Sequence, residues 1–180
     1  MDTVVLQSFR THDVPPWLAR CMASVQAWAL QEGWGYEFLD DRFLVLAPDW
    51  ARRRCEGNLY ALTDLCRLQW IRDRLDAGCR RVIWSDADLL VFAPSRLDLR
   101  TAHGHGLAHE VFVHLRADGT MTSQEGLSNA LMVFEQSDDV LDAYLTAGLQ
   151  RLAALPPGVT PRTALGPQSA ETVLRKPGRA

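Results

Sequence analysis

Apolar runs of strand length alternate with helical patterns in the first half of the chain, and this alternation constrains the fold more than any other feature. Residues 3–9, 36–39 and 80–85 form the three runs, which are rich in β-branched and aromatic side chains. Helices are predicted between them, over 15–33 and 58–77, and each is closed by glycine. The order strand, helix, strand, helix, strand predicts an α/β layered sheet.

The second half of the chain carries weaker signals. Pro48 favours a loop within 43–57, and an apolar stretch at 89–92 is expected to continue the strand before it. The region 100–126 is rich in histidine and glycine and offers one strand. The later elements expected are strands at 111–115 and 128–134 and helices over 138–154 and 166–174.

Composition favours one globular domain over residues 1–180, because 47% of the residues are hydrophobic and 23% are charged. The net charge of −3 gives no reason to expect a nucleic-acid partner, which requires clustered positive charge. No run approaches the ~18 apolar residues of a transmembrane segment, and residues 1–9 lack the basic start of a signal peptide. Lys176 is the only lysine, an arginine bias typical of GC-rich bacterial genes. We expect a cytoplasmic protein, at most peripheral to the inner membrane face.

The four cysteines show no C-x-x-C pair, and three fall inside apolar helical patterns. We interpret them as buried thiols in a reducing compartment, with a disulfide pair or a metal site as the alternative. They are Cys21, Cys55, Cys66 and Cys79.

The strongest chemical signal is a pair of carboxylates, Asp86 and Asp88, directly after the apolar run 82–85. Such a run is typical of a strand buried on both faces of a parallel sheet, and ligands bind beyond the carboxyl ends of such strands. Residues two apart on an extended chain point the same way, so both acids can address one cation. Hard oxygen ligands suit Mg²⁺ or Mn²⁺, which would neutralise a diphosphate leaving group. A solvated loop is the alternative interpretation of an isolated D-x-D.

A second motif precedes this strand. Asp64 and Arg67 lie three apart on one face of the helix 58–77, where they could form an ordinary surface ion pair. Together with Asp86 and Asp88, they make the block 62–92 resemble the sugar-binding region of DXD-containing glycosyltransferases, in which an S-D-x-x-R-type helix precedes a strand ending in D-x-D. The resemblance extends over residues 4–166.

Three shorter pieces of the chain follow the same family pattern. Gln7 ends the first strand where the family often has a His-Gln pair. Asn129 lies in a Ser-Asn-x-x-apolar strand, and Gly166-Pro167 resembles the start of a later helix. The resemblance implies a GT-A fold, a Rossmann-like, mostly parallel sheet that binds a nucleotide sugar together with Mn²⁺ or Mg²⁺.

The resemblance also implies roles for individual residues. Asp88 would ligate the metal directly, and Asp86 would contact the donor ribose or the metal through water. Asp64 and Arg67 would hold donor-sugar hydroxyls or phosphate, and Asn129 would line the sugar pocket. Gln7 would lie near the nucleobase. The donor would be a UDP-sugar transferred with retention to an unknown acceptor, a glycan or a lipid-linked saccharide.

One departure from the family concerns the C-terminal metal ligand, which does not follow Gly166. We therefore keep as an alternative a minimal, truncated or catalytically defective domain that binds a sugar or scaffolds a partner. Four histidines crowd the middle of the chain, and three interpretations stay open for them: an ordinary loop, acceptor recognition, or replacement of the missing ligand. These are His103, His105, His109 and His114.

A haloacid-dehalogenase-type phosphatase is a further alternative, because its nucleophilic aspartate also begins a D-x-D after a strand. That motif requires Thr or Val four residues after the first aspartate, where this chain has Leu90. It also requires a downstream lysine, and Lys176 lies in the C-terminal tail. Both mismatches count against this class.

Overall fold

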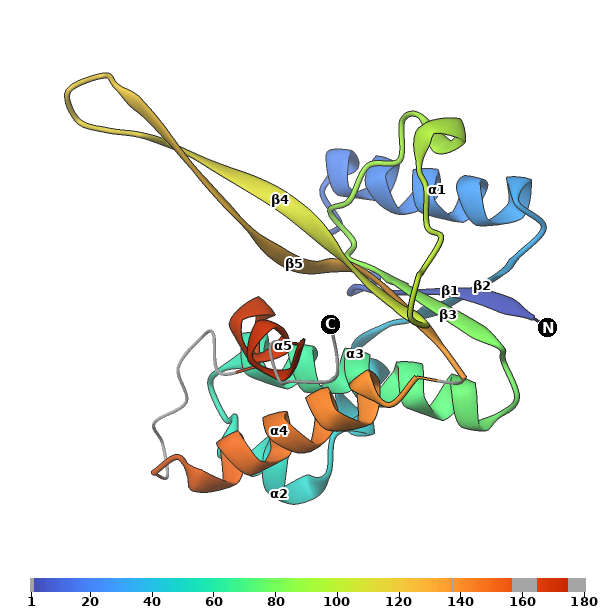
Figure 1. The fold of residues 1–180 in the computed structure, drawn as a ribbon, viewed down its shortest axis with the longest axis vertical. Helices are drawn as coiled ribbons and strands as arrows, with labels where there is room; N and C mark the ends of the chain where they lie inside the picture. The colour runs from blue at the N-terminus through green and yellow to red at the C-terminus, as the bar shows by residue number, and fades with distance from the viewer. Residues whose placement is uncertain (1, 137, 157–164, 175–180) are drawn as a thin grey trace.

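The computed structural model describes residues 2–136, 138–156 and 165–174. Its centre is a five-stranded sheet in the order β2-β1-β3-β5-β4 (Figure 1). The first strand along the chain pairs in parallel with the second and the third, and the fifth runs antiparallel to the third. The strands are β1 (Thr3–Ser8), β2 (Gly35–Leu39), β3 (Arg81–Ser85), β4 (His105–Leu115) and β5 (Met121–Glu135). This confirms the predicted α/β class and its Rossmann-like first half.

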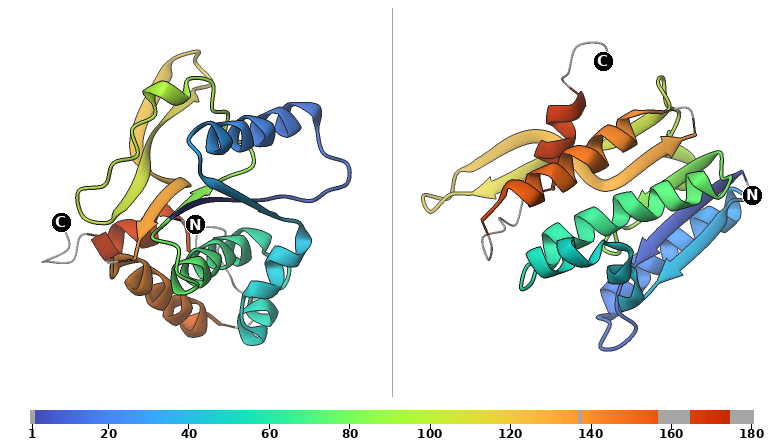
Figure 2. Two further views of the ribbon diagram at one scale, coloured as in Figure 1. Left: turned by 90° about the vertical axis from the view of Figure 1, so that its right-hand side faces the viewer. Right: turned by 90° about the horizontal axis from the view of Figure 1, so that it is seen from below.

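Helices cover both faces of the sheet, as Figure 2 shows from two further directions. The helix α1 (Pro16–Gln31) packs on one face together with the segment 89–99, which contains the short 3₁₀ helix η2 (Pro94–Arg96). The helices α3 (Leu59–Asp76) and α4 (Val140–Ala154) pack on the other face. The shorter helices α2 (Asp49–Arg54) and α5 (Pro167–Leu174) extend the second layer. None of the described helices is long and apolar enough to cross a membrane.

The strand β3 shows why its run of apolar residues is unbroken. Val82 and Trp84 contact the core beneath α3 and α4, whereas Ile83 contacts the core beneath α1. All three side chains are at most 3% exposed. Successive side chains of a strand point to opposite faces, so a strand covered on both faces must be apolar at every position.

The prediction of a loop over 43–57 was wrong. The segment forms a 3₁₀ helix, η1 (Asp41–Leu46), followed by α2. Pro48 occupies the N-cap of α2, where a missing N–H costs nothing, rather than breaking an element. Phe43 and Ala51 from this segment are buried in the core.

Two further expectations on the sheet need correction. Residues 89–92 form no strand, because the chain turns at Asp86 and leaves the ladder there. The region 100–126 is not a loop with one short strand. It contains most of a long antiparallel hairpin, in which β4 begins at His105 and β5 begins at Met121. The hairpin closes through a hydrogen bond from Arg116 N to Thr120 O, and Gly119 there adopts φ of +80°.

The cysteines are all free thiols in the structure, and Cys21, Cys55 and Cys66 are buried. Burial raises the pKa of Cys66 to about 12, so this thiol stays protonated and behaves as a small apolar side chain. The fold thus uses these cysteines as core residues.

Candidate active site

An open cleft of about 400 Å³ lies at the carboxyl edge of the sheet, where β1, β2 and β3 end. The loops that follow these strands line the cleft together with residues of α1, η1 and α3. Open α/β sheets bind their ligands at this edge. The charged residues of the lining are Arg10, Asp40, Asp41, Arg67, Asp86 and Asp88.

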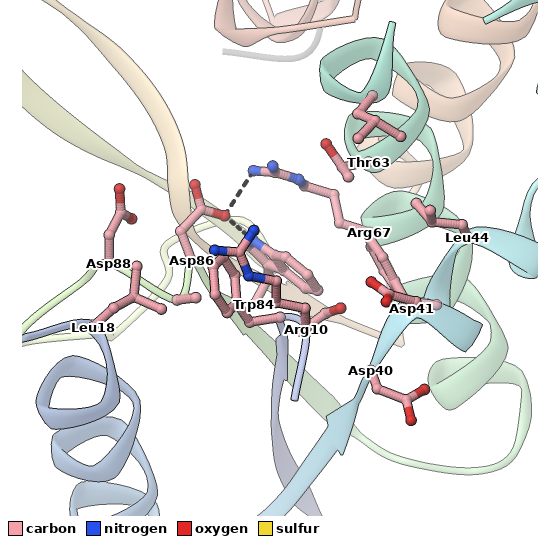
Figure 3. A pocket seen from close by; sticks show the side chains of 15 residues that line it. Arg10, Leu18, Asp40, Asp41, Leu44, Thr63, Arg67, Trp84, Asp86 and Asp88 are labelled. Atoms are coloured by element: carbon pink, nitrogen blue, oxygen red, sulfur yellow. Dashed lines mark hydrogen bonds and ion pairs between the residues drawn. The ribbon is translucent and has the colours of Figure 1, made fainter. Parts of the chain in front are cut away.

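The end of β3 brings both acids of the D-x-D into this cleft (Figure 3). The ladder ends at Ser85, and Asp86 N still donates to Ala130 O at 2.7 Å. A turn follows, closed by Leu89 N donating to Asp86 O at 3.2 Å. Asp88 lies on that turn, and its exposed carboxylate makes no hydrogen bond or ion pair with any described residue. One acid is therefore anchored by the sheet, and the other is open to a ligand.

Arg67 reaches from α3 to the anchored acid. Its Nη1 lies 3.0 Å from Asp86 Oδ1, and its Nη2 lies 3.2 Å from Asp64 Oδ1. Nη1 also donates to the backbone oxygen of Asn129 at 2.9 Å, and the guanidinium lies 5.1 Å from the ring centroid of Trp84. Only 10% of the Arg67 side chain is exposed, so this pairing is buried and not the surface pair that spacing alone suggested.

The two oxygens of Asp86 have different surroundings. Oδ1 accepts a hydrogen bond from Trp84 Nε1 at 2.6 Å and receives Arg67. Oδ2 has no partner among the described residues, and it is not a buried unsatisfied atom. The ion pair with Arg67 thus fixes the carboxylate and leaves one oxygen available in the open cleft (Figure 3).

Asp64 and Asn129 form the back of the same network. Asn129 Nδ2 donates to Asp64 Oδ1 at 2.9 Å, joining α3 to β5. Burial raises the pKa of Asp64 above its usual value of 3.8, and Arg67 and Asn129 oppose that rise. Burial likewise raises the pKa of Asp86, and Arg67 and the Trp84 N–H oppose it. Arg67 is therefore the charge that most strongly opposes the rise in the pKa of both carboxyls.

Gln7 is fully buried beneath the site. Its Nε2 donates to Asp86 O at 3.1 Å, and its Oε1 accepts from the Tyr36 hydroxyl at 2.8 Å. Gln7 is not part of the cleft lining. Its contacts hold the backbone at Asp86 and join β1 to β2, so its influence on a ligand would act through that backbone.

The carboxylate oxygens of the cleft suit a hard divalent cation that takes most of its ligands from phosphate and water. Asp88 and Asp86 Oδ2 supply two carboxylate oxygens, and Mg²⁺ characteristically takes one or two carboxylates plus phosphate oxygens and waters. Within residues 2–136, 138–156 and 165–174, no group of three or more His, Cys, Asp or Glu side chains could hold a metal by itself. The residues present therefore fit a cation that arrives with a diphosphate.

His105, in the histidine-rich segment, does not complete this site. His105 pairs with Phe134 of β5, whereas Asp86 is bonded to Ala130, four residues along the same strand. That separation is roughly 13 Å at the rise of a β-strand, so His105 lies toward the opposite edge of the sheet. His105 Nδ1 lies 3.3 Å from Asp138 Oδ2 instead. The register therefore argues against His105 as the missing ligand, whereas the hypothesis for His103, His109 and His114 stays a prediction.

Sequence reasoning missed the aromatic floor of the cleft. Trp84 stacks on Phe43 with ring centroids 5.5 Å apart, and Trp70 meets it edge-on at 6.3 Å. The indole N–H of Trp84 then orients Asp86. The position of a tryptophan two residues before the first acid, on the same side of the strand, was the available signal.

The comparisons with known proteins found similarity in structure and none in sequence. No protein-family model matches the chain, and no curated protein matches it in sequence. Among solved structures, the fold is similar to that described as the crystal structure of a glycosyltransferase involved in the glycosylation of the major capsid of PBCV-1, with a TM-score of 0.52. The identity is 15%, and the match covers 98% of this chain and 79% of that chain. The likeness shows that the α/β fold of this chain is similar to the fold of that protein.

Proposed function

We propose that this chain is a glycosyltransferase that binds a nucleoside-diphosphate sugar, most simply a UDP-sugar, together with Mn²⁺ or Mg²⁺ and transfers the sugar to a glycan or lipid-linked acceptor. The observation that carries this proposal is the open cleft at the carboxyl edge of the sheet, into which Asp86 and Asp88 both project. The likeness in fold to a glycosyltransferase supports the same class. Retention of anomeric configuration belongs to the proposal through the family resemblance alone.

Each residue of the cleft has a part in this scheme. Asp88 and Asp86 Oδ2 would hold the cation, which would supply a Lewis acid for the departing nucleoside diphosphate. Arg10 lies in the same lining and adds positive charge for the phosphates. Asp41 is an exposed carboxylate at the end of β2, where it can accept hydrogen bonds from ribose hydroxyls.

The buried network behind the two acids would hold the Asp86 carboxylate in place and would not itself take part in the reaction. Arg67, held by Asp64 and the Asn129 backbone, fixes the direction of the Asp86 carboxylate. The family resemblance assigns donor-sugar contacts to Asp64 and Asn129, but neither residue is among those that line the cleft. Gln7 holds the backbone oxygen of Asp86 from below. A preorganised carboxylate needs little rearrangement when a cation and a diphosphate arrive.

The first test measures binding and turnover separately. Calorimetric titration of UDP should show tight binding with Mn²⁺, and at least tenfold weaker binding without it. Asp88→Asn should abolish the Mn²⁺-dependent part of the affinity and the release of UDP from a UDP-sugar. Glu32→Gln, which alters an exposed acid at the other end of α1, is the matched control and should change neither.

The outcome separates the proposal from its alternatives. UDP affinity that is the same with and without Mn²⁺, and the same in Asp88→Asn, would contradict the proposed metal site. Mn²⁺-dependent binding without turnover of any UDP-sugar or other nucleotide sugar would instead favour a domain that binds donors without catalysing transfer.

A further inference from the structure

The distal part of the β4–β5 hairpin, residues 108–128, projects from the body as an arm (Figures 1 and 2). Two-stranded ribbons are marginally stable in water unless a further strand or layer packs on them. Five large apolar side chains of the arm are nevertheless exposed, by 45% to 74%. They are Val111, Phe112, Val113, Leu115 and Met121.

The outer edge of the arm is an unprotected strand. β4 is the edge strand of the sheet, and its partner in the described chain is β5 alone. None of the other described residues makes a backbone hydrogen bond to residues 107–115. Proteins usually protect such edges with lysine, proline or a bulge. Residues 109–115 contain neither lysine nor proline, and the irregularity in pairing lies at the base of the arm, between Leu107 and Ala108.

The sequence of this edge is complementary to itself. An antiparallel pair related by a two-fold axis at Phe112 brings Val111 opposite Val113 of the other copy. It also places Glu110 opposite His114 of the other copy, and the axis produces this pair twice. Their backbones pair with β5, but the side chains of Glu110 and His114 make no hydrogen bond or ion pair with any described residue. Opposite-charge and β-branched pairs across strands both stabilise a ladder.

From these observations we infer that two copies of this chain pair through the β4 edge of their arms and form a two-fold dimer. The pairing uses residues 109–115 of each copy and turns two ribbons into one four-stranded sheet. Main-chain hydrogen bonds supply the adhesion, and the Glu110–His114 pairs fix the register. The inference is independent of the proposed activity, because the arm residues at this edge do not line the cleft.

A charge exchange tests the register of the pairing. Analytical ultracentrifugation of the full chain at pH 6.5 should show a dimer of twice 20.2 kDa. Glu110→Lys and His114→Glu should each raise the dissociation constant by about tenfold, because the first removes both Glu110–His114 pairs and the second places two glutamates opposite one another twice. The double variant E110K/H114E should return it to within about threefold of the wild type.

Two further variants make the result decisive. V111K/V113K places lysines opposite one another along the edge and should give a monomer with unchanged circular dichroism. Leu30→Lys alters an equally exposed apolar residue at the end of α1 and should leave the dimer intact. A wild type that stays monomeric at 100 μM, or charge variants whose effects simply add, would overturn the inference.

Discussion

At the scale of single residues, one arginine holds the site together. Arg67 contacts two carboxylates and a backbone oxygen, and it lies against the Trp84 ring. Removing one partner of a buried ion pair leaves the other charge in a poorly solvated place, which costs more than the pair contributes when intact. Two carboxylates depend on this cation, so its removal is expected to disturb stability and ligand binding together.

Arg67→Met should therefore lower the free energy of unfolding by about 3 kcal/mol at pH 7. Urea unfolding followed by tryptophan fluorescence measures this change. Arg67→Lys retains the charge but cannot bridge Asp64 and Asp86 with a planar fork, so its loss should be smaller. Equal losses in the two variants would show that the charge itself contributes little.

The raised pKa values of Asp64 and Asp86 give a pH dependence with a definite sign. Their folded pKa values lie above 3.8, so the folded state binds these protons more tightly than the unfolded chain does. The two carboxyls therefore favour folding most at acid pH, and that contribution decreases as the pH rises above about 3.8.

Asp64→Asn removes one of these titrations while keeping a group of the same shape. The free energy of unfolding of the variant, measured relative to the wild type between pH 4 and pH 7, should be higher at the upper end of this range than at the lower end, because the wild type loses the Asp64 contribution as the pH rises past about 3.8. Glu32→Gln, at the exposed C-terminal end of α1, is the control. A relative stability that stays flat over this range, or falls, would contradict the raised pKa of Asp64.

At the scale of elements, the sequence predicted the strands that are buried on both faces of the sheet, and it did not predict the exposed hairpin. The strands β1 and β3 and the helix α3 were predicted within two residues of their ends, because both faces of the sheet are buried there and every position carries a signal. The D-x-D was placed at the edge of the sheet by the same reasoning. The prediction weakened where the chain leaves the two helical layers.

The arm and the segment η1–α2 illustrate that limit. Residues 110–125 pair with one another outside the core. Neither face of these strands is buried, so their sequence shows no regular alternation of apolar and polar residues from which a strand could be predicted. In η1–α2, Pro48 begins a helix instead of interrupting one. The pairing of Arg67 with Asp86 was missed for another reason. The two residues come from different elements, and a local sequence pattern does not show which residues of distant elements are in contact.

At the scale of the whole molecule, the body and the arm are separable. The core consists of the five-stranded sheet and its helices, and none of the exposed apolar side chains of the arm belongs to it. The cleft lies in the body, between the ends of the parallel strands and the helices that follow them. Donor binding and self-association should therefore respond to different changes.

Shortening the arm tests this separation directly. Glu110 and Gly126 lie opposite one another, so replacing residues 111–125 with Asn-Gly closes the hairpin early with a two-residue turn. At a concentration where the wild type is monomeric, the melting temperature should change by no more than about 2 °C, because no buried core contact is lost. UDP binding with Mn²⁺ should be unchanged, while the dimer should disappear. If donor affinity falls together with dimerisation, the arm of one copy contributes to the cleft, and the body cannot be regarded as the complete binding unit.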